Sequence, residues 1–398
     1  MRVGIDRMGL AFPAWRVSCR ELAAARGVAP DKVALGLGME SFGVPMPWQD
    51  AVTLAADAVD DLVAQGVDLT QVGRIVVATE SALDGSKPVA AWLHGMFGLR
   101  DDCEAFDVKF ACVGGAYALL DCLRFVQSTG SVALVVATDI ALYGPDGSAE
   151  CTQGAGAAAL LLTQAPGLLA VDPGCTGTHS RDVDDFYRPF GRMSAVVKGR
   201  KSVECYLAGL EAVARYRARF APHGLLQGAV DRMVFHVPYP GLPRKALARL
   251  LQSEAVAEPS ARRLAEGVEW SVLPSRFAGN TYTASLFVAL AGLLSGLAGG
   301  SGEHGEAGAG LGGVRVGMYS YGSGSGAKFF VGELQGSAQS VRHVVSRVAA
   351  LPALPLLSVA EMEHVFYRRE ILSGIASGPG WRLAHEDETG YRRYSRGC

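Results

Sequence analysis

The chain has almost no excess of charge of either sign. Its 398 residues include 37 Lys and Arg against 39 Asp and Glu, which gives a formal net charge of -2. It also contains no long stretch of basic residues interleaved with aromatic residues, a pattern typical of proteins that bind a polyanion. We therefore expect no nucleic acid among its partners.

Long hydrophobic runs are missing as well. The most apolar segment, residues 283–297, is rich in Ala, Gly and Ser, and it is shorter than the roughly 20 residues that a membrane-spanning helix needs. Residues 1–8 carry charges where a signal peptide would be apolar. The sequence predicts a buried helix at 283–297, no contact with a membrane and a cytoplasmic location.

Cysteines are present, but not in the spacing of a metal site. No two of the eight form a Cys-x-x-Cys pair, and no spacing of Cys and His matches a zinc site. Free thiols in a reducing compartment fit this pattern best, and we expect no bound metal. The cysteines are Cys19, Cys103, Cys112, Cys122, Cys151, Cys175, Cys205 and Cys398.

Strand-like runs alternate with helical patterns along the chain. Runs typical of strands cover residues 74–79, 103–110 and 131–137, and helical patterns cover residues 88–97 and the stretch after Cys112. This alternation predicts an α/β fold with a mostly parallel sheet.

The second half of the chain repeats the order of the first. A strand-like run that contains His236 stands where the run ending at Glu80 stood, and the helix from Thr283 stands where the helix after Cys112 stood. Duplicated halves place a site at their junction. We divide the chain into an N-terminal half, residues 1–168, and a C-terminal half, residues 169–398.

Two parts of the C-terminal half differ from the rest in composition. Residues 298–313 are mostly Gly and Ala with few large apolar side chains, which predicts a flexible surface loop. After Leu356 the chain becomes more charged, and we expect a peripheral C-terminal segment.

Cys112 is the strongest candidate for a nucleophile. A strand-like approach over residues 106–110 gives way to small residues and then to helical spacing, which places the thiol at the start of a helix. There the unpaired N–H groups and the positive end of the helix dipole favour the thiolate. A small buried hydrophobic residue is an equally common role for cysteine, so the assignment needs partners.

Glu80 and His236 are candidates for those partners. Glu80 ends an apolar strand, where α/β sheets place their ligands, and partial burial would raise its pKa toward that of a general base. His236 lies in an apolar run that Pro238 ends. Taken alone, each is more often a solvated acid or a hydrogen-bonded core histidine.

Two Gly-rich segments do not fit nucleotide binding. Residues 153–157 lead into an Ala and Leu strand, and residues 320–326 lead into Lys328 and two Phe residues. Both lack the context of a phosphate loop or a dinucleotide fingerprint. Their glycines instead allow a backbone or a narrow acyl chain to approach closely.

Taken together, these motifs resemble the 3-hydroxy-3-methylglutaryl-CoA synthases. The resemblance begins at Val3 and spans nearly the whole chain. It implies a thiolase-like fold, in which two similar halves form a five-layered αβαβα architecture, usually as a homodimer. The segments that carry it are residues 78–84, 106–112, 152–157, 235–239, 279–286 and 320–325.

The resemblance implies a role for each candidate. Cys112 would be acylated, Glu80 would be the acid and base, and His236 would bind and protonate the acceptor ketone. No cofactor is implied, because the substrates are acyl thioesters of coenzyme A or of the phosphopantetheine arm of an acyl carrier protein. Supporting substrate-binding residues would be Asp139, Asp185, Asn280 and Ser320.

Departures from the family pattern favour a carrier protein over coenzyme A. Gly241 stands five residues after His236, where members that use coenzyme A tend to have Lys and members that add β-branches to polyketides tend to have Gly. Val108 also resembles the polyketide members. Arg244 and Lys245 remain as possible phosphate partners. The sequence therefore favours β-branching in polyketide biosynthesis.

Three other functions stay open from the sequence. The first is the mevalonate-pathway enzyme, which uses acetyl-CoA and acetoacetyl-CoA. The second is a ketosynthase-like acyltransferase, which needs Cys112 and His236 but not Glu80. The third is a non-catalytic acyl-binding or scaffold protein, against which the presence of all three residues argues.

Overall fold

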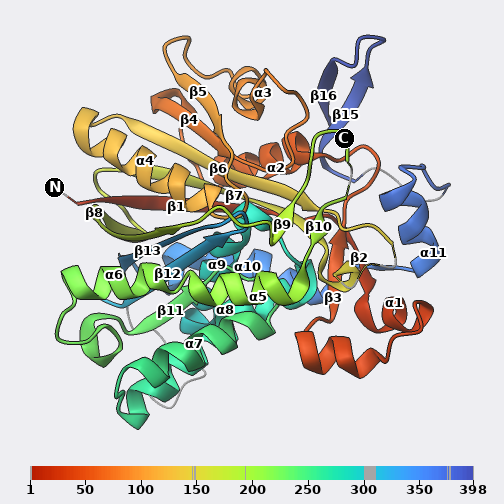
Figure 1. Ribbon diagram of the computed structural model, residues 1–398. Helices are drawn as coiled ribbons and strands as arrows, with labels where there is room; N and C mark the ends of the chain where they lie inside the picture. The colour runs from red at the N-terminus through yellow and green to blue at the C-terminus, as the bar shows by residue number, and fades with distance from the viewer. Residues whose placement is uncertain are drawn as a thin grey trace.

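The computed structural model describes residues 2–145, 147, 149–192, 194–299, 311–373, 375 and 378–397. Its largest sheet is built from both halves of the chain (Figure 1). The strands of this sheet are β1 (Val3–Ala11), β4 (Val72–Ala78), β5 (Glu104–Val108), β6 (Val132–Ala141), β7 (Gly154–Thr163), β8 (Leu169–Ser180), β11 (Arg232–Phe235), β12 (Arg315–Gly322) and β13 (Gly326–Leu334).

The order of these strands shows the internal duplication. It runs β11-β12-β13-β8-β1-β7-β6-β4-β5, so that β4-β6-β7-β1 and β11-β12-β13-β8 are mirrored about the pairing of β1 with β8. In each set the first two strands are parallel and the following pairs are antiparallel. The division of the chain at residue 168 stays a prediction.

The expectation of a mostly parallel sheet was wrong. Within this nine-stranded sheet, as described, only β4 with β5, β4 with β6, and β11 with β12 pair in parallel. The strands β6 and β7 are joined through a loop and the short 3-10 helix η3 (Glu150–Thr152). Without a crossover helix the chain returns antiparallel to the strand it has just left.

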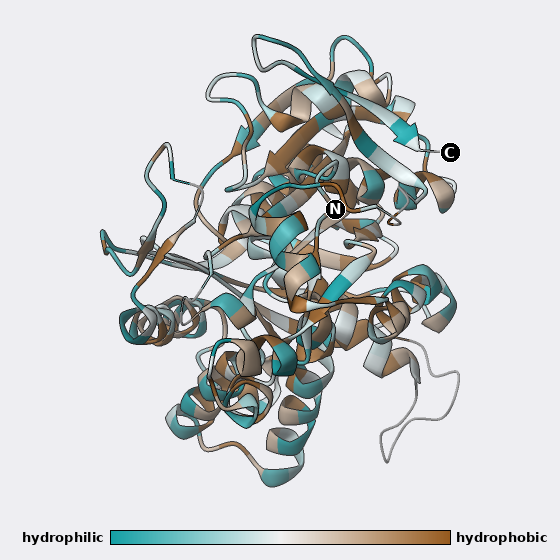
Figure 2. Cartoon of the chain, turned by 90° about the vertical axis from the view of Figure 1, so that its right-hand side faces the viewer, coloured by the Kyte–Doolittle hydropathy of each residue, from teal (hydrophilic) through white to brown (hydrophobic). Residues whose placement is uncertain are grey.

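Helices surround the strands. They are α1 (Cys19–Ala25), α2 (Ala51–Ala64), α3 (Val89–Met96), α4 (Gly114–Thr129), α5 (Gly199–Ala208), α6 (Glu211–Phe220), α7 (Gly241–Ser253), α8 (Glu258–Ala278), α9 (Ser285–Gly299), α10 (Arg342–Ala350) and α11 (Val359–Met362). Figure 2 shows hydrophobic residues concentrated in the central strands and hydrophilic residues along the outer helices and loops.

The alternation of side chains along β4 places helices on both faces of the first half of the sheet. Ile75 and Val77 belong to the core that contains α2 and α3, whereas Val76 and Ala78 belong to the core that contains α4 and α9. The period of two in a strand produces this division. The second core is continuous across both halves of the chain.

The start of α4 lies against the start of α9. A Cβ atom on Gly115 would lie 2.4 Å from the carbonyl oxygen of Thr283, so this close approach requires glycine. The buried helix expected over residues 283–297 is confirmed as α9. By length and composition Tyr282–Gly299 would be long enough to cross a membrane, but 72% of it is buried inside the protein.

The flexible loop expected over residues 298–313 overlaps the end of α9. Residues 298 and 299 belong to α9, and residues 311–313 form a turn before β12. The remainder of the expected flexible loop, residues 300–310, lies outside the described residues.

The C-terminal segment has more contacts than a peripheral appendage would. Its strand β14 (Leu356–Leu357) pairs with β2 (Trp15–Ser18), which also pairs with β3 (Ser41–Val44). The hairpin of β15 (Gly380–Glu386) and β16 (Arg392–Gly397) packs on α2 (Figure 1).

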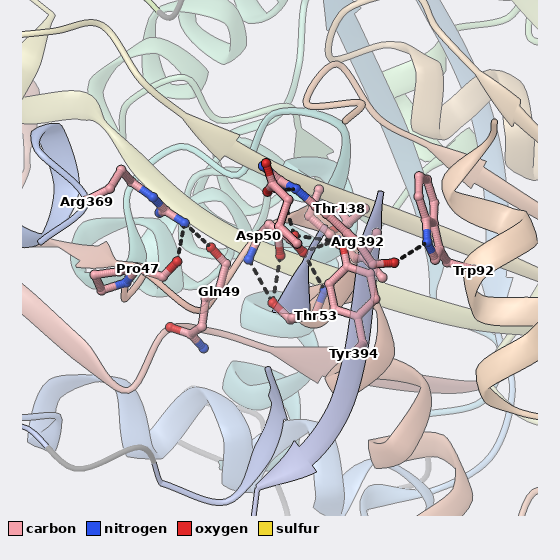
Figure 3. Close-up of polar contacts among 12 residues, drawn as sticks. Pro47, Gln49, Asp50, Thr53, Trp92, Thr138, Arg369, Arg392 and Tyr394 are labelled. Atoms are coloured by element: carbon pink, nitrogen blue, oxygen red, sulfur yellow. Dashed lines mark hydrogen bonds and ion pairs between the residues drawn. The ribbon is translucent and has the colours of Figure 1, made fainter. Parts of the chain in front are cut away.

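Polar contacts fix this hairpin to the start of α2. The carboxylate of Asp50 caps that helix, and it also accepts hydrogen bonds from Arg392 and Tyr394 (Figure 3). Arg369 donates to the carbonyl oxygens of Pro47 and Gln49. The C-terminal segment therefore holds the loop before α2, close to the candidate site.

Candidate active site

Cys112 lies in the sharp connection between β5 and α4. Ala111 has a left-handed backbone with a φ of 42°, and α4 begins two residues after Cys112, at Gly114. A left-handed residue at this point turns the chain abruptly and stores backbone strain at a functional position. The thiol is thereby presented at the N-terminal end of α4, as the sequence predicts.

Glu80 is the direct partner of Cys112. The Cys112 thiol donates a hydrogen bond to Oε1 of Glu80 over 3.3 Å. Glu80 follows β4, and the neighbouring parallel strand β6 carries Asp139. The backbone N–H of Glu80 donates to Oδ1 of Asp139 over 2.8 Å. Parallel strands end at the same edge of a sheet, which explains why these residues meet.

Burial changes the acid strength of both groups. Burial, followed by the charge of Asp139, raises the pKa of Glu80 to about 8. Burial and the charges of Glu80 and Asp139 raise the pKa of the Cys112 thiol well above its usual value. A resting thiolate at the helix terminus is therefore not favoured, because burial of the thiol, together with the nearby charges of Glu80 and Asp139, outweighs the helix dipole. The proton of Cys112 is instead positioned for transfer to Glu80.

His236 is a neutral imidazole in this structure. It follows β11, its backbone N–H donates to the carbonyl oxygen of Tyr319, and burial lowers the pKa of its side chain to about 3. Its Nδ1 is buried without a hydrogen-bond partner among the described residues. A neutral imidazole carries one N–H donor and one acceptor nitrogen, which suits it to bind a ketone or alkoxide oxygen.

A cavity of about 310 Å³ brings Cys112 together with two of the other predicted site residues. Cys112, His236 and Asn280 all line it, although they come from three distant parts of the sequence. The Asn280 amide donates to the hydroxyl of Tyr143 over 3.2 Å, and its oxygen accepts from the backbone N–H of Tyr282. The remaining wall is largely aromatic and aliphatic, which suits an acyl chain.

Asp139 and Asp185 do not line this cavity. Asp139 is fully buried and accepts from the backbone N–H groups of Glu80 and Thr283, so it ties the end of β4 to the start of α9. Asp185 accepts from the Tyr321 hydroxyl and from the backbone N–H of Gly324. Both residues support the walls of the site.

The other predicted binding residues lie farther away. Ser320 is buried, its hydroxyl has no partner among the described residues, and it is not part of the cavity lining. Arg244 forms a two-pronged ion pair with Glu269, and Lys245 is exposed on α7. Neither cation lines the cavity. Their roles toward a phosphate stay predictions.

Several aromatic residues of the site were not singled out from the sequence. Tyr143, Phe186 and Tyr282 pack around Cys112, with Tyr143 and Phe186 edge to face at a centroid separation of 6.3 Å. Tyr282 has a φ of 44°. Each lies within four positions of a predicted site residue: Tyr143 of Asp139, Phe186 of Asp185, and Tyr282 of Asn280. This closeness in the sequence was the signal that could have identified them.

No metal centre accompanies these residues. Across the described residues no group of three or more His, Cys, Asp or Glu side chains is placed to hold a metal ion.

Comparison with known proteins identifies relatives along the whole chain. The family model for the N-terminal part of hydroxymethylglutaryl-coenzyme A synthase matches residues 1–166, and the model for its C-terminal part matches residues 169–269 and 254–354. The chain is 34% identical to hydroxymethylglutaryl-CoA synthase of Enterococcus faecalis over 92% of each sequence. It is 32% identical to that of Schizosaccharomyces pombe, over 99% of this chain and 98% of the relative.

Solved structures of two kinds are similar in fold. MvaS in complex with 3-hydroxy-3-methylglutaryl coenzyme A has a TM-score of 0.87 and 35% identity over 100% of this chain and 99% of that chain. The curacin-pathway HMG synthase in complex with holo donor-ACP has a TM-score of 0.88 and 26% identity over 100% of both chains. These matches confirm the predicted α/β, thiolase-like fold.

Proposed function

Because the chain belongs to the hydroxymethylglutaryl-coenzyme A synthase family, we propose that it adds a β-branch to an acyl group held by an acyl carrier protein in polyketide biosynthesis. Members of this family are acyltransferases that condense two acyl thioesters, and the chain is therefore an enzyme of this type. The hydrogen bond between Cys112 and Glu80, beside His236 and Asn280, is the observation that carries the proposed mechanism.

The first step is acyl transfer to Cys112. The Cys112 sulfur attacks the carbonyl of an acetyl thioester as ionised Glu80 accepts the thiol proton. Glu80 then passes this proton to the departing carrier thiolate, which leaves Glu80 ionised for the next step. The short contact between the two side chains means that no diffusing base is needed. The acetyl group then occupies the end of the cavity, enclosed by Tyr143, Phe186 and Tyr282.

Condensation follows when Glu80 removes a proton from the acetyl methyl group. The resulting enolate carbon attacks the β-ketone of the second substrate, which would lie against His236 and Asn280 in the same cavity. Because burial lowers the pKa of His236 to about 3 and keeps it neutral, its N–H binds and stabilises the oxygen as it becomes an alkoxide. The proton held by Glu80 then completes the hydroxyl group, in place of the proton that the resemblance assigns to His236. Hydrolysis of the Cys112 thioester then releases a product with a free carboxylate.

Gly241 supports a carrier protein as the holder of the acceptor. It is the first residue of α7, and a Cβ atom there would lie 3.2 Å from the carbonyl oxygen of Gly36. No cation is fixed at this position, and the nearby Arg244 is already neutralised by Glu269. The cavity therefore offers an apolar passage for the phosphopantetheine arm without a committed partner for the additional phosphate of coenzyme A.

We expect Gly241→Lys to shift the carrier preference toward coenzyme A. One charged contact contributes about 1 to 3 kcal/mol, which corresponds to about a tenfold or larger gain in kcat/KM for acetoacetyl-CoA. The measurement compares kcat/KM for acetoacetyl-CoA and for acetoacetyl-carrier protein, with the acetyl donor supplied on each carrier in turn. Gly241→Ala is the control, because it crowds the same oxygen of Gly36 without adding charge.

The native protein should prefer the carrier-bound acceptor by about tenfold or more. Equal or faster use of acetoacetyl-CoA, with no gain in Gly241→Lys, would instead favour the mevalonate-pathway reaction. Two observations keep that second candidate open. The chain is 34% identical to a hydroxymethylglutaryl-CoA synthase, and Arg200 lines the cavity as a possible phosphate partner.

A homodimer and a cytoplasmic location remain part of this proposal. The strand β5 lies at the edge of the sheet, pairing with β4 on one side among the described strands, and its Phe106 is 37% exposed. An open edge with an exposed aromatic residue is suited to pairing with a second copy of the chain.

A further inference from the structure

A second cavity lies next to the first, and Glu80 belongs to the lining of this second cavity alone. Its volume is about 740 Å³, and Glu80 lines it whereas Cys112 does not. Phe186 and Ser323 line both cavities, so these two side chains form part of the wall between them. Glu80 is therefore accessible from the second cavity and not from the first cavity, which would hold the acyl chain.

The lining of this second cavity is strongly cationic. Two of its arginines are already engaged, because Arg392 pairs with Asp50 and Arg369 donates to backbone carbonyls before α2 (Figure 3). The acidic residues in the lining are Asp50 and Glu80. Its cations are Lys109, Arg188, Arg192, Arg369 and Arg392.

Three of these cations form no salt bridge with an acidic side chain among the described residues. Arg188 donates to the main-chain oxygen of Glu80. The ammonium group of Lys109 lies 5.4 Å from the ring centre of Phe190, and no polar group of the described chain contacts the guanidinium of Arg192. Exposed cations at a cavity mouth leave a positive potential that a small anion would neutralise.

Resting on the proposed function, we propose that this cavity admits the water that hydrolyses the Cys112 thioester and that Lys109 and Arg192 bind the carboxylate formed there. The acceptor and its phosphopantetheine arm fill the first cavity at that stage, so water needs another approach to the same carbonyl carbon. Glu80 faces this second approach and contacts the sulfur of Cys112.

The hydrolytic step balances without any further reactant. Glu80 accepts a proton from water as the water oxygen bonds to the thioester carbon, and the bond from that carbon to the Cys112 sulfur breaks. The proton on Glu80 returns to the sulfur, and the new carboxylic acid releases one proton to solvent. The negative charge that appears lies on the side of the positive lining residues.

The test uses the double variant Lys109→Gln/Arg192→Gln in the full chain. Both side chains are exposed and have no acidic partner among the described residues, so their replacement leaves no buried charge unpaired. Rapid quenching at steady state followed by intact-protein mass spectrometry measures free, acetylated and condensed enzyme. Arg342→Gln is the matched control, because Arg342 is also exposed but lies on α10, away from the cavity.

We expect the condensed adduct on Cys112 to accumulate and kcat to fall by about fivefold in the double variant, from two weakened surface electrostatic contacts. The rate of acetylation should stay within about twofold of the native rate, and Lys109→Arg/Arg192→Lys should restore turnover. Native kcat and no accumulated adduct in the double variant would overturn the inference. A native enzyme that forms no condensed adduct or product at all would instead overturn the proposed function.

Discussion

Cys112→Ala is expected to abolish both acetylation of the protein and product formation. Among the described cysteines Cys112 alone lines the acyl cavity, and its thiol contacts Glu80 over 3.3 Å. No other described cysteine both lines this cavity and donates its thiol proton to Glu80. Intact-protein mass spectrometry after incubation with an acetyl thioester should show one acetyl adduct on the native protein and none on the variant.

Cys151→Ala is the matched control for this substitution. Cys112 and Cys151 are each 9% exposed, and burial raises the pKa of both thiols. Cys151 hydrogen-bonds to a backbone carbonyl instead of a carboxylate. Its variant should retain the acetyl adduct. An adduct that persists in Cys112→Ala and disappears in Cys151→Ala would reverse the assignment.

Glu80→Gln is expected to separate acyl transfer from condensation. A removed acid or base typically costs about a hundredfold or more in rate. Proton abstraction from the acetyl methyl group depends on Glu80 more strongly than thioester exchange does, because a methyl proton is far less acidic than a thiol. Acetyl-enzyme should therefore accumulate while the condensed product falls at least about a hundredfold. Glu388→Gln, an exposed acid near the C-terminus, is the control.

The pH dependence provides a second measure of the same group. Burial and Asp139 raise the pKa of Glu80 to about 8, and abstraction requires the ionised form. Below this pKa most molecules carry a protonated Glu80, so condensation from preformed acetyl-enzyme should accelerate as the pH rises toward about 8 and then level off. A flat profile, or native turnover by Glu80→Gln, would favour a simple acyltransferase.

The sequence predicts which residues form the site better than it predicts their ionisation states. Cys112, Glu80 and His236 occur in short motifs, and each motif ends or interrupts an apolar run, so their placement at strand ends follows from local pattern. The structure brings Cys112 and His236 to one cavity, whereas Glu80 lines the second cavity and contacts the Cys112 thiol. The roles of these residues stay predictions until the variants are measured.

The ionisation of Cys112 could not be predicted from its own segment. The helix that follows favours a thiolate, but Glu80 and Asp139 come from two other strands, and their burial depends on the packing of α9. Likewise the antiparallel pairing of β6 with β7 depends on the absence of a long crossover helix between them, where the described residues form loops and the short η3. Both properties come from contacts between segments, which a linear motif does not contain.

The C-terminal segment illustrates the same limit. Its charged composition suggests a peripheral position, yet Arg369 and Arg392 reach the loop before α2 and line the second cavity. Each arginine finds its partner more than three hundred positions away in the sequence. Long side chains of this kind look alike in a sequence whether they are solvated or engaged.

Product analysis with isotope-labelled substrates tests the central claim most directly. The native protein is supplied with a labelled acetyl donor and an acetoacetyl acceptor in heavy-oxygen water, and the thioester products are identified by mass spectrometry. The account predicts a 3-hydroxy-3-methylglutaryl-type product that carries the label of the donor in its new branch and one heavy oxygen in its new carboxylate. Label that appears solely by exchange between thioesters, or a chain-extended β-ketoacyl product with no heavy oxygen, would contradict it.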